Sequence, residues 1–227
     1  LFRSTLIEAR SARQPWQVYL AGWIQCYHWD VLQQKAYALP ADAPCFQNSN
    51  TRGYWDNLAY TETKWGELGT TQVRGSEAHI HPRIEKLIPA GSCVIDVGCY
   101  TGALGDRLIK KCKAEYRGID ISERAIQELQ RRHMEGVVAD IGAVQLELEG
   151  HEIITCTEVL EHLDEPRLAH ALEQMSKARF VIISVPKGEI PAPHKEHVRE
   201  FKEASDLSKL LSGYFKNVHV EDVDPHY

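Results

Sequence analysis

The stretch from Val94 to Gly105 constrains the fold of this chain more than any other. It begins with the β-branched run Val94–Val97, which is typical of a buried parallel strand. Gly98 and Gly102 then interrupt the run, and residues 103–111 continue with leucine and isoleucine at helical spacing. A strand, a glycine turn and a helix in this order place a ligand at the carboxyl end of the strand.

The glycine turn differs from the turn that binds dinucleotides. A dinucleotide turn needs glycine at its first, third and sixth positions, so that backbone N–H groups can approach the pyrophosphate. These positions hold Gly98, Tyr100 and Ala103 here. Because the Tyr100 side chain opposes close phosphate approach, the sequence favours a nucleoside without a pyrophosphate, such as S-adenosylmethionine (SAM). A tight turn that binds no ligand is the alternative, since a glycine motif alone is a weak signal.

Three further strand-like segments end in acidic residues. Residues 116–120, 137–140 and 153–158 end in Asp120, Asp140 and Glu158. Asp120 follows the first glycine by about 20 residues, the usual distance to the carboxylate that binds ribose hydroxyls. Each acidic residue alone can be a helix cap or a solvated turn. Together with the glycine turn, they predict a binding site at one edge of a sheet.

Helical and strand patterns alternate along the rest of the chain. This alternation predicts an α/β fold with a doubly wound, mostly parallel sheet and helices on both faces. The expected helices cover residues 76–88, 103–112, 123–133, 164–177 and 203–212, and the expected strands cover residues 94–97, 115–119, 137–139, 152–157, 180–185 and 214–222.

Residues from about 93 to 220 resemble class I SAM-dependent methyltransferases. The matching segments are residues 94–102, 118–122, 139–141 and 157–163. The resemblance implies the Rossmann-like methyltransferase fold with a sheet of the seven-stranded type. The last antiparallel strand of that fold would follow residue 222, and we expect it either to be missing here or to lie in sequence outside this chain.

The resemblance also implies the residues that bind SAM. The glycine turn would wrap the methionine part of SAM, and Asp96 would order that turn. Asp120 would bind the ribose hydroxyls, while Asp140 and Ile141 would lie at the adenine edge. The full set expected to bind the cofactor is Asp96, Gly98, Cys99, Tyr100, Gly102, Asp120, Ile121, Asp140, Ile141 and Thr157.

A cluster of acidic and histidine residues follows the fourth predicted strand. Glu158, Glu161 and His162 would share one face of a helical turn, and His197 follows the fifth strand at the same sheet edge. Two carboxylates and imidazoles predict a site for Mg²⁺, Mn²⁺ or Zn²⁺. Such a metal would bind the acceptor hydroxyl and lower its pKa. Small-RNA 3′-terminal 2′-O-methyltransferases and ubiquinone-pathway O-methyltransferases resemble this pattern.

Other interpretations of the cluster remain open. The string from Glu158 to His162 is equally similar to metal-free relatives, in which His162 is a general base or packs under the loop. In a further interpretation, Glu158 belongs to neither a metal site nor a catalytic pair and faces SAM. The catalytic residues expected from the cluster are Glu161, His162 and His197.

The net charge of −6 argues against nucleic acid as the main partner, because phosphate contacts need an excess of lysine and arginine. The sequence therefore predicts an O-methyltransferase for a small hydroxylated acceptor: a sugar, glycan, lipid or natural product. A small-RNA 2′-O-methyltransferase is the alternative enzyme. It would need a basic groove for the RNA, and the only basic clusters in the sequence are residues 110–113 and 131–132. A non-catalytic SAM-fold module that binds a partner is the alternative of another class.

Residues 1–75 are expected to form a helical, aromatic cap or a dimerisation segment, and residues 76–227 the SAM-binding methyltransferase domain. All five tryptophans fall within the first 65 residues. The chain contains no apolar run of the roughly 18 residues that a membrane span needs, and no signal-peptide pattern. Scattered cysteines without a CxxC pair indicate reduced thiols and a cytoplasmic protein. Since the first residue is leucine, the chain is expected to be processed or part of a larger protein.

Overall fold

A computed structural model describes residues 52–56, 75–148, 152–187 and 197–223 of the protein. In this part of the chain, parallel strands form a five-stranded sheet in the order β3-β2-β1-β4-β5. The strands are β1 (Cys93–Val97), β2 (Glu115–Asp120), β3 (Glu135–Val138), β4 (Ile153–Thr157) and β5 (Phe180–Ser184). The helices are α5 (Gly75–Leu87), α6 (Ala103–Cys112), α7 (Glu123–Arg131), α8 (Glu165–Met175) and α9 (Ala204–Leu211). The predicted doubly wound α/β fold is confirmed.

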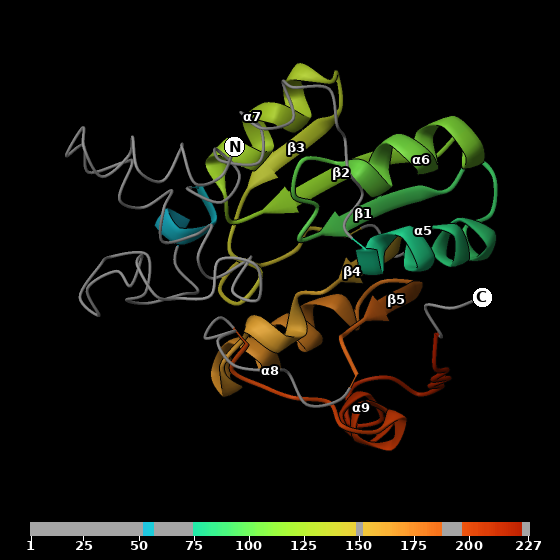
Figure 1. Ribbon diagram of the computed structural model, residues 1–227, viewed down its shortest axis with the longest axis vertical. Coiled ribbons are helices and arrows are strands. Elements are labelled where there is room, and N and C mark those ends of the chain that lie inside the picture. Colours follow the sequence, from blue (N-terminus) through green and yellow to red (C-terminus); the bar gives the residue numbers. More distant parts are fainter. Residues whose placement is uncertain (1–51, 57–74, 149–151, 188–196, 224–227) are drawn as a thin grey trace, which may run out of the picture.

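Alternating residues of the central strands build a core on each face of the sheet. Val94 of β1 packs in a cluster with residues of α5 and α6, whereas the next residue, Ile95, packs in a cluster with α8 and α9. Ile153 and Ile154 divide between the same two clusters. Both central strands are therefore buried on both faces, which explains their continuous apolar sequences. In Figure 1, α5, α6 and α7 are grouped around β1 to β3, and α8 and α9 lie beyond β4 and β5.

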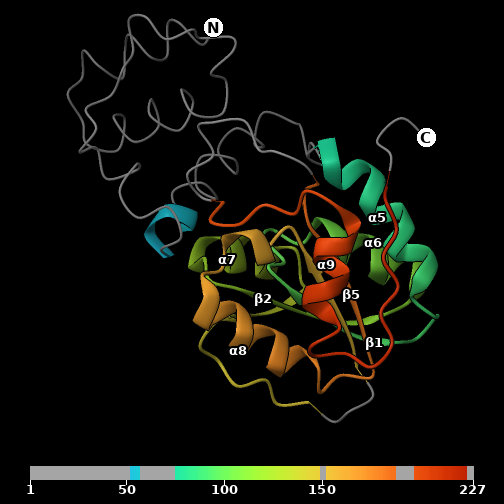
Figure 2. The same ribbon diagram turned by 90° about the horizontal axis from the view of Figure 1, so that it is seen from below.

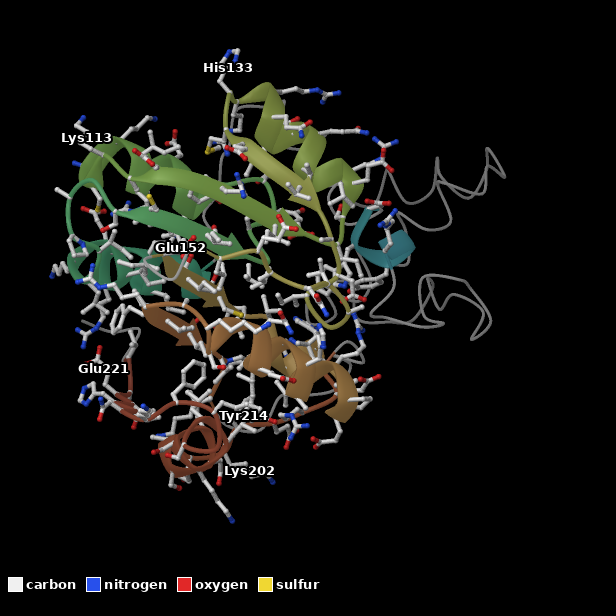
Figure 3. All side chains as sticks on the ribbon, turned by 180° about the vertical axis from the view of Figure 1, so that it is seen from behind. Lys113, His133, Glu152, Lys202, Tyr214 and Glu221 are labelled. Atoms are coloured by element: carbon white, nitrogen blue, oxygen red, sulfur yellow. The ribbon has the colours of Figure 1, made fainter. Side chains whose placement is uncertain are left out.

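The sheet presents its carboxyl edge to the short helical segment at residues 52–56. The arrowheads of β1, β2 and β3 point toward this segment in Figure 1, and both ribbon views place it beside α7 (Figure 2). Lys113 and Glu221 lie at the opposite end of the molecule (Figure 3). The loops that follow the strands therefore share one edge with residues 52–56.

The strand predicted at residues 214–222 is wrong, because the described residues 214–223 contain no strand. Phe215, Val218 and Val220 are partly buried against the core beside α8 and α9. Glu221 then pairs with Arg83 of α5 at 2.9 Å, so the segment connects α9 with α5 (Figure 2). Its apolar pattern is satisfied by side-chain packing, without a backbone ladder.

Residues 1–51 and 57–74 of the segment expected to form a helical, aromatic cap or a dimerisation segment lie outside the described residues. Within the described part of the chain, no helix is long and apolar enough to cross a lipid bilayer.

Candidate active site

The turn after β1 requires glycine at two positions. Gly98 and Gly102 have φ angles of 72° and 83°, in the left-handed region that glycine adopts without steric cost. A Cβ atom on Gly98 would overlap the Val159 side chain, and a Cβ atom on Gly102 would lie 2.6 Å from Leu129 and Met134 atoms. The backbone N–H of Gly98 donates to the Ile119 carbonyl at 2.8 Å, which fixes the turn against β2.

Asp120 joins the glycine turn to the loop after β2. Its two carboxylate oxygens accept hydrogen bonds from the backbone N–H groups of Tyr100 and Ser122, each at 2.8 Å. A carboxylate oxygen has two lone pairs and can accept hydrogen bonds from two donors at once. Ile121, also expected to bind the cofactor, lies between Asp120 and Ser122 in the sequence and is half-buried.

Asp96 holds the strand from which the turn departs. Its side chain is buried and accepts hydrogen bonds from the Tyr116 hydroxyl of β2 at 2.8 Å and the Thr155 hydroxyl of β4 at 2.7 Å. Burial and the Asp96 charge raise the pKa of Tyr116 well above its usual range, so the phenol keeps the proton that it donates. Asp96 thereby connects the three central strands just before the predicted SAM-binding turn.

Cys99, also in the predicted set, is a buried thiol. Burial, followed by the charge of Asp120, raises its pKa well above the usual range. The residue therefore remains a neutral thiol that packs beneath the turn.

Asp140 lies at the beginning of the loop after β3, where the adenine edge is predicted. Its carboxylate accepts from the Gly142 backbone N–H at 2.9 Å and pairs with Arg167 of α8 at 2.7 Å. Ile141 is buried in the core beside it. Sequence reasoning missed Arg167, because nothing in the local pattern indicates a contact between α8 and this loop.

Glu158 separates from the other members of the predicted metal cluster. Its φ angle is 55°, and its side chain accepts a hydrogen bond from the Ser184 hydroxyl of β5 at 2.9 Å. Thr157, the last residue of β4, pairs with Ser184 in the sheet. The left-handed backbone of Glu158 therefore interrupts the helical face on which Glu158, Glu161 and His162 were expected together.

Three members of the predicted cluster do meet. Glu161 and His162 belong to a 3₁₀ turn at Leu160–His162, and the Val198 backbone N–H donates to the Glu161 carbonyl at 2.8 Å. This hydrogen bond brings the neighbouring His197 to the turn. One ligand atom from each of Glu161, His162 and His197 lies within 4.8 Å of the others. Two imidazole nitrogens and a carboxylate oxygen at this spacing suit a divalent transition metal.

Glu161 is poorly compensated for its burial. The residue is 1% exposed, and its Oε2 atom has no hydrogen-bond partner among the described residues. Its Oε1 atom lies 3.8 Å from His162 Nε2, beyond hydrogen-bond distance. Burial, followed by the nearby charge of Glu158, raises the pKa of Glu161 well above its usual range. A bound cation would reverse this effect, because it favours the ionised carboxylate.

Two residues that sequence reasoning did not assign to the site also reach it. The Trp55 ring packs edge-to-face on His162 with centroids 4.9 Å apart, and His162 packs on His197 in the same way at 4.7 Å. Asp56 accepts hydrogen bonds from the Ser122 hydroxyl at 2.8 Å and the Arg124 backbone N–H at 3.1 Å. The sequence signal for this contact was the concentration of tryptophans before residue 66, but it does not indicate which tryptophan reaches the site.

Residues 94–178 match a protein family described as a methyltransferase domain. The matched range contains the glycine turn, the three acidic residues Asp120, Asp140 and Glu158, and the Glu161–His162 turn described above. The chain carries a class I SAM-dependent methyltransferase domain.

Relatives of this methyltransferase domain include ubiquinone biosynthesis O-methyltransferases. The enzyme of Albidiferax ferrireducens is 30% identical over 92 residues, which cover 37% of this chain and 36% of the relative. The enzyme of Ralstonia nicotianae is 34% identical over 84 residues, which cover 34% of this chain and 35% of the relative. The chain thus spans about a third of the length of the curated relatives that it matches.

Solved structures share the fold of the methyltransferase domain. A TehB-like SAM-dependent methyltransferase from Corynebacterium glutamicum has a TM-score of 0.52 at 18% identity, over 71% of this chain and 83% of that chain. Magnesium protoporphyrin IX methyltransferase from Synechocystis, solved with bound SAM, has a TM-score of 0.51 at 20% identity, over 80% and 88%. At these identities the likeness concerns the fold.

Proposed function

We propose that this domain transfers a methyl group from SAM to a hydroxyl group of a small acceptor. The observation that carries the proposal is the position of Glu161, His162 and His197, which gather ligand atoms within 4.8 Å of one another in loops after β4 and β5. Carboxyl ends of parallel strands form the edge at which such sheets bind ligands. The names of the relatives, ubiquinone biosynthesis O-methyltransferases, support an oxygen acceptor.

The residues around the glycine turn fit a nucleoside. SAM, when bound, supplies an electrophilic methyl group on its sulfonium. The backbone of Gly98–Gly102 would hold the methionine part, and Asp120 would accept hydrogen bonds from ribose hydroxyls while retaining its bonds to Tyr100 and Ser122. Asp140, held by Arg167, would face the adenine. These contacts would fix the methyl group in line with the acceptor oxygen.

The acceptor must also lose its hydroxyl proton. Glu161, His162 and His197 would hold a divalent metal. The buried Oε2 atom of Glu161, which has no hydrogen-bond partner among the described residues, fits this role. The metal, when bound, would polarise the acceptor hydroxyl and lower its pKa. Without a metal, His162 would take the proton as a general base. Both arrangements use the same side chains, and removal of the metal distinguishes them.

A small acceptor fits the charges better than RNA does. The basic residues expected to contact RNA lie on α6 and α7, where Lys110 pairs with Asp106 and Arg131 pairs with Glu128. Arg132 donates to the Thr101 carbonyl of the glycine turn. These pairings and the net charge of −6 weaken the attraction of these clusters for phosphates.

Methyl transfer from radiolabelled SAM to a panel of phenols, catechols and sugars tests the proposal. We expect transfer to collapse in EDTA and after His197→Ala, and to return to the EDTA-treated wild type with Mn²⁺ or Mg²⁺. His219→Ala, which changes an exposed histidine in the C-terminal segment, is the matched control and should keep full activity. Full activity in EDTA would overturn the metal, and methylation of amines alone would overturn the oxygen acceptor.

A further inference from the structure

The segment at residues 54–56 contacts both halves of the site. Asp56 contacts the beginning of α7, next to the loop that carries Asp120, and Trp55 contacts the ring of His162. Trp55 and Asp56 therefore connect the two sides of the proposed site. The nucleoside side is formed by the glycine turn and the Asp120 loop, and the acceptor side is formed by His162 and His197. Tyr54 supports Trp55 by an edge-to-face contact at 5.0 Å.

We propose that Asp56 is a positioning residue that attaches residues 54–56 to the loop at the end of β2, which carries Asp120 and Ser122 and is called the ribose-binding loop below. This attachment holds Trp55 in place as a wall of the acceptor site. This inference rests on the proposed function, because it assigns the His162 side of the site to the acceptor.

Hydrogen bonds link Asp56 to the nucleoside side. The Oδ1 atom of Asp56 accepts from both the Ser122 hydroxyl and the Arg124 backbone N–H. The backbone N–H of Ser122 donates to Asp120, and Asp120 accepts from Tyr100 in the glycine turn. Movement of the ribose-binding loop would therefore reach Asp56 through one shared residue, Ser122.

The position of Asp56 is favourable electrostatically. A carboxylate beside the first turn of a helix interacts well with the unpaired N–H groups and the positive end of the helix dipole. The Ser122 hydroxyl accepts from the Ala125 backbone N–H while it donates to Asp56, so its donor and acceptor capacities are both used.

Aromatic contacts link the same segment to the acceptor side. The rings of Trp55, His162 and His197 form a continuous edge-to-face series. Because Trp55 precedes Asp56 directly, their Cα atoms are about 3.8 Å apart. Loss of the Asp56 hydrogen bonds would therefore release Trp55 from His162, and the acceptor site would lose this wall.

Fluorine NMR of the full chain labelled with 5-fluorotryptophan tests the inference, with the Trp55 resonance assigned by its loss in Trp55→Phe. In the wild type, S-adenosylhomocysteine should shift the Trp55 resonance. In Asp56→Ala, the resonance should move in the free protein and lose its response to saturating S-adenosylhomocysteine, whose affinity should fall about tenfold with the lost hydrogen bonds to a charged group. Asp56→Asn keeps an Oδ1 acceptor and should restore the response.

Glu123→Gln is the matched control, because it removes a carboxylate from the first turn of α7 without touching the Asp56 contacts. It should leave the Trp55 resonance unchanged. An Asp56→Ala protein that keeps the wild-type resonance, response or affinity would overturn the inference. A wild-type protein that binds no S-adenosylhomocysteine would overturn the proposed function instead, while the Trp55 shift in free Asp56→Ala would still test the attachment.

Discussion

Glu161 is a carboxylic acid in surroundings that oppose its ionisation. Its usual pKa is 4.5, and burial together with Glu158 raises the pKa in the folded protein. Between the two pKa values, the unfolded chain releases the proton and the folded chain keeps it. The stabilising contribution of neutral Glu161 is therefore complete below the unfolded pKa and is lost as the pH rises toward the folded pKa.

Glu161→Gln should accordingly stabilise the metal-free protein at high pH. In EDTA at about pH 8, we expect the free energy of unfolding to rise by roughly 1–3 kcal/mol, the cost of a poorly satisfied buried polar group, with little change near pH 4. Urea denaturation at both pH values measures this difference. Glu173→Gln, an exposed site on α8, should change neither value. Equal stability of wild type and Glu161→Gln at both pH values would contradict the account.

The Tyr116 hydroxyl of β2 donates a buried side-chain hydrogen bond to the Asp96 carboxylate of β1. Tyr116→Phe removes the donor while its ring still fills the space beside Gly105. Because the acceptor is a charged carboxylate, we expect the free energy of unfolding to fall by about 1.5–3 kcal/mol. Tyr214→Phe, at a half-buried site after α9, is the comparison in the same urea experiment and should cost less (Figure 3). A Tyr116→Phe protein as stable as the wild type would show that this bond contributes nothing.

At the scale of elements, the glycine turn joins the fold to the site. Gly91 and Gly98 share left-handed φ angles of 75° and 72°, but only Gly98 faces another side chain closely. A Cβ atom on Gly91 would meet no atom within 4 Å, whereas one on Gly98 would overlap Val159. The two positions therefore separate backbone strain from steric overlap.

Gly91→Ala should cost about 1–2 kcal/mol of stability from the left-handed backbone alone and keep affinity for S-adenosylhomocysteine. Gly98→Ala adds the overlap, so it should cost more stability and weaken binding at least tenfold. Thermal unfolding and calorimetry measure both effects. Similar binding losses in the two variants would contradict the steric argument.

The sequence predicted the elements that its local pattern determines. Buried β-branched runs identified β1 and β4 as strands. The apolar alternation at residues 214–222 misled, because packing against a core and pairing in a sheet produce the same pattern.

The candidate site was predictable only in part, for a similar reason. The spacing of Glu161 and His162 fixed their proximity, but the left-handed backbone at Glu158 turned that residue toward β5. The contacts of Trp55 and Asp56 join residues far apart in the chain, and no local periodicity encodes them.

At the scale of the whole molecule, the proposed site divides into a side expected to bind the nucleoside and a side expected to bind the acceptor, along one edge of the sheet. The nucleoside side is built on loops after β1, β2 and β3, and the acceptor side on segments after β4 and β5. Residues 54–56 contact both sides. Binding at one side can therefore be measured without knowledge of the acceptor.

Calorimetric titration with S-adenosylhomocysteine tests the central claim, that a nucleoside binds where Asp120 meets the glycine turn. The account predicts one binding site in the wild type and an affinity at least tenfold weaker in Asp120→Ala, since the ribose hydroxyls lose a charged acceptor. Absence of binding to the folded wild type, or equal affinity in Asp120→Ala, would contradict it.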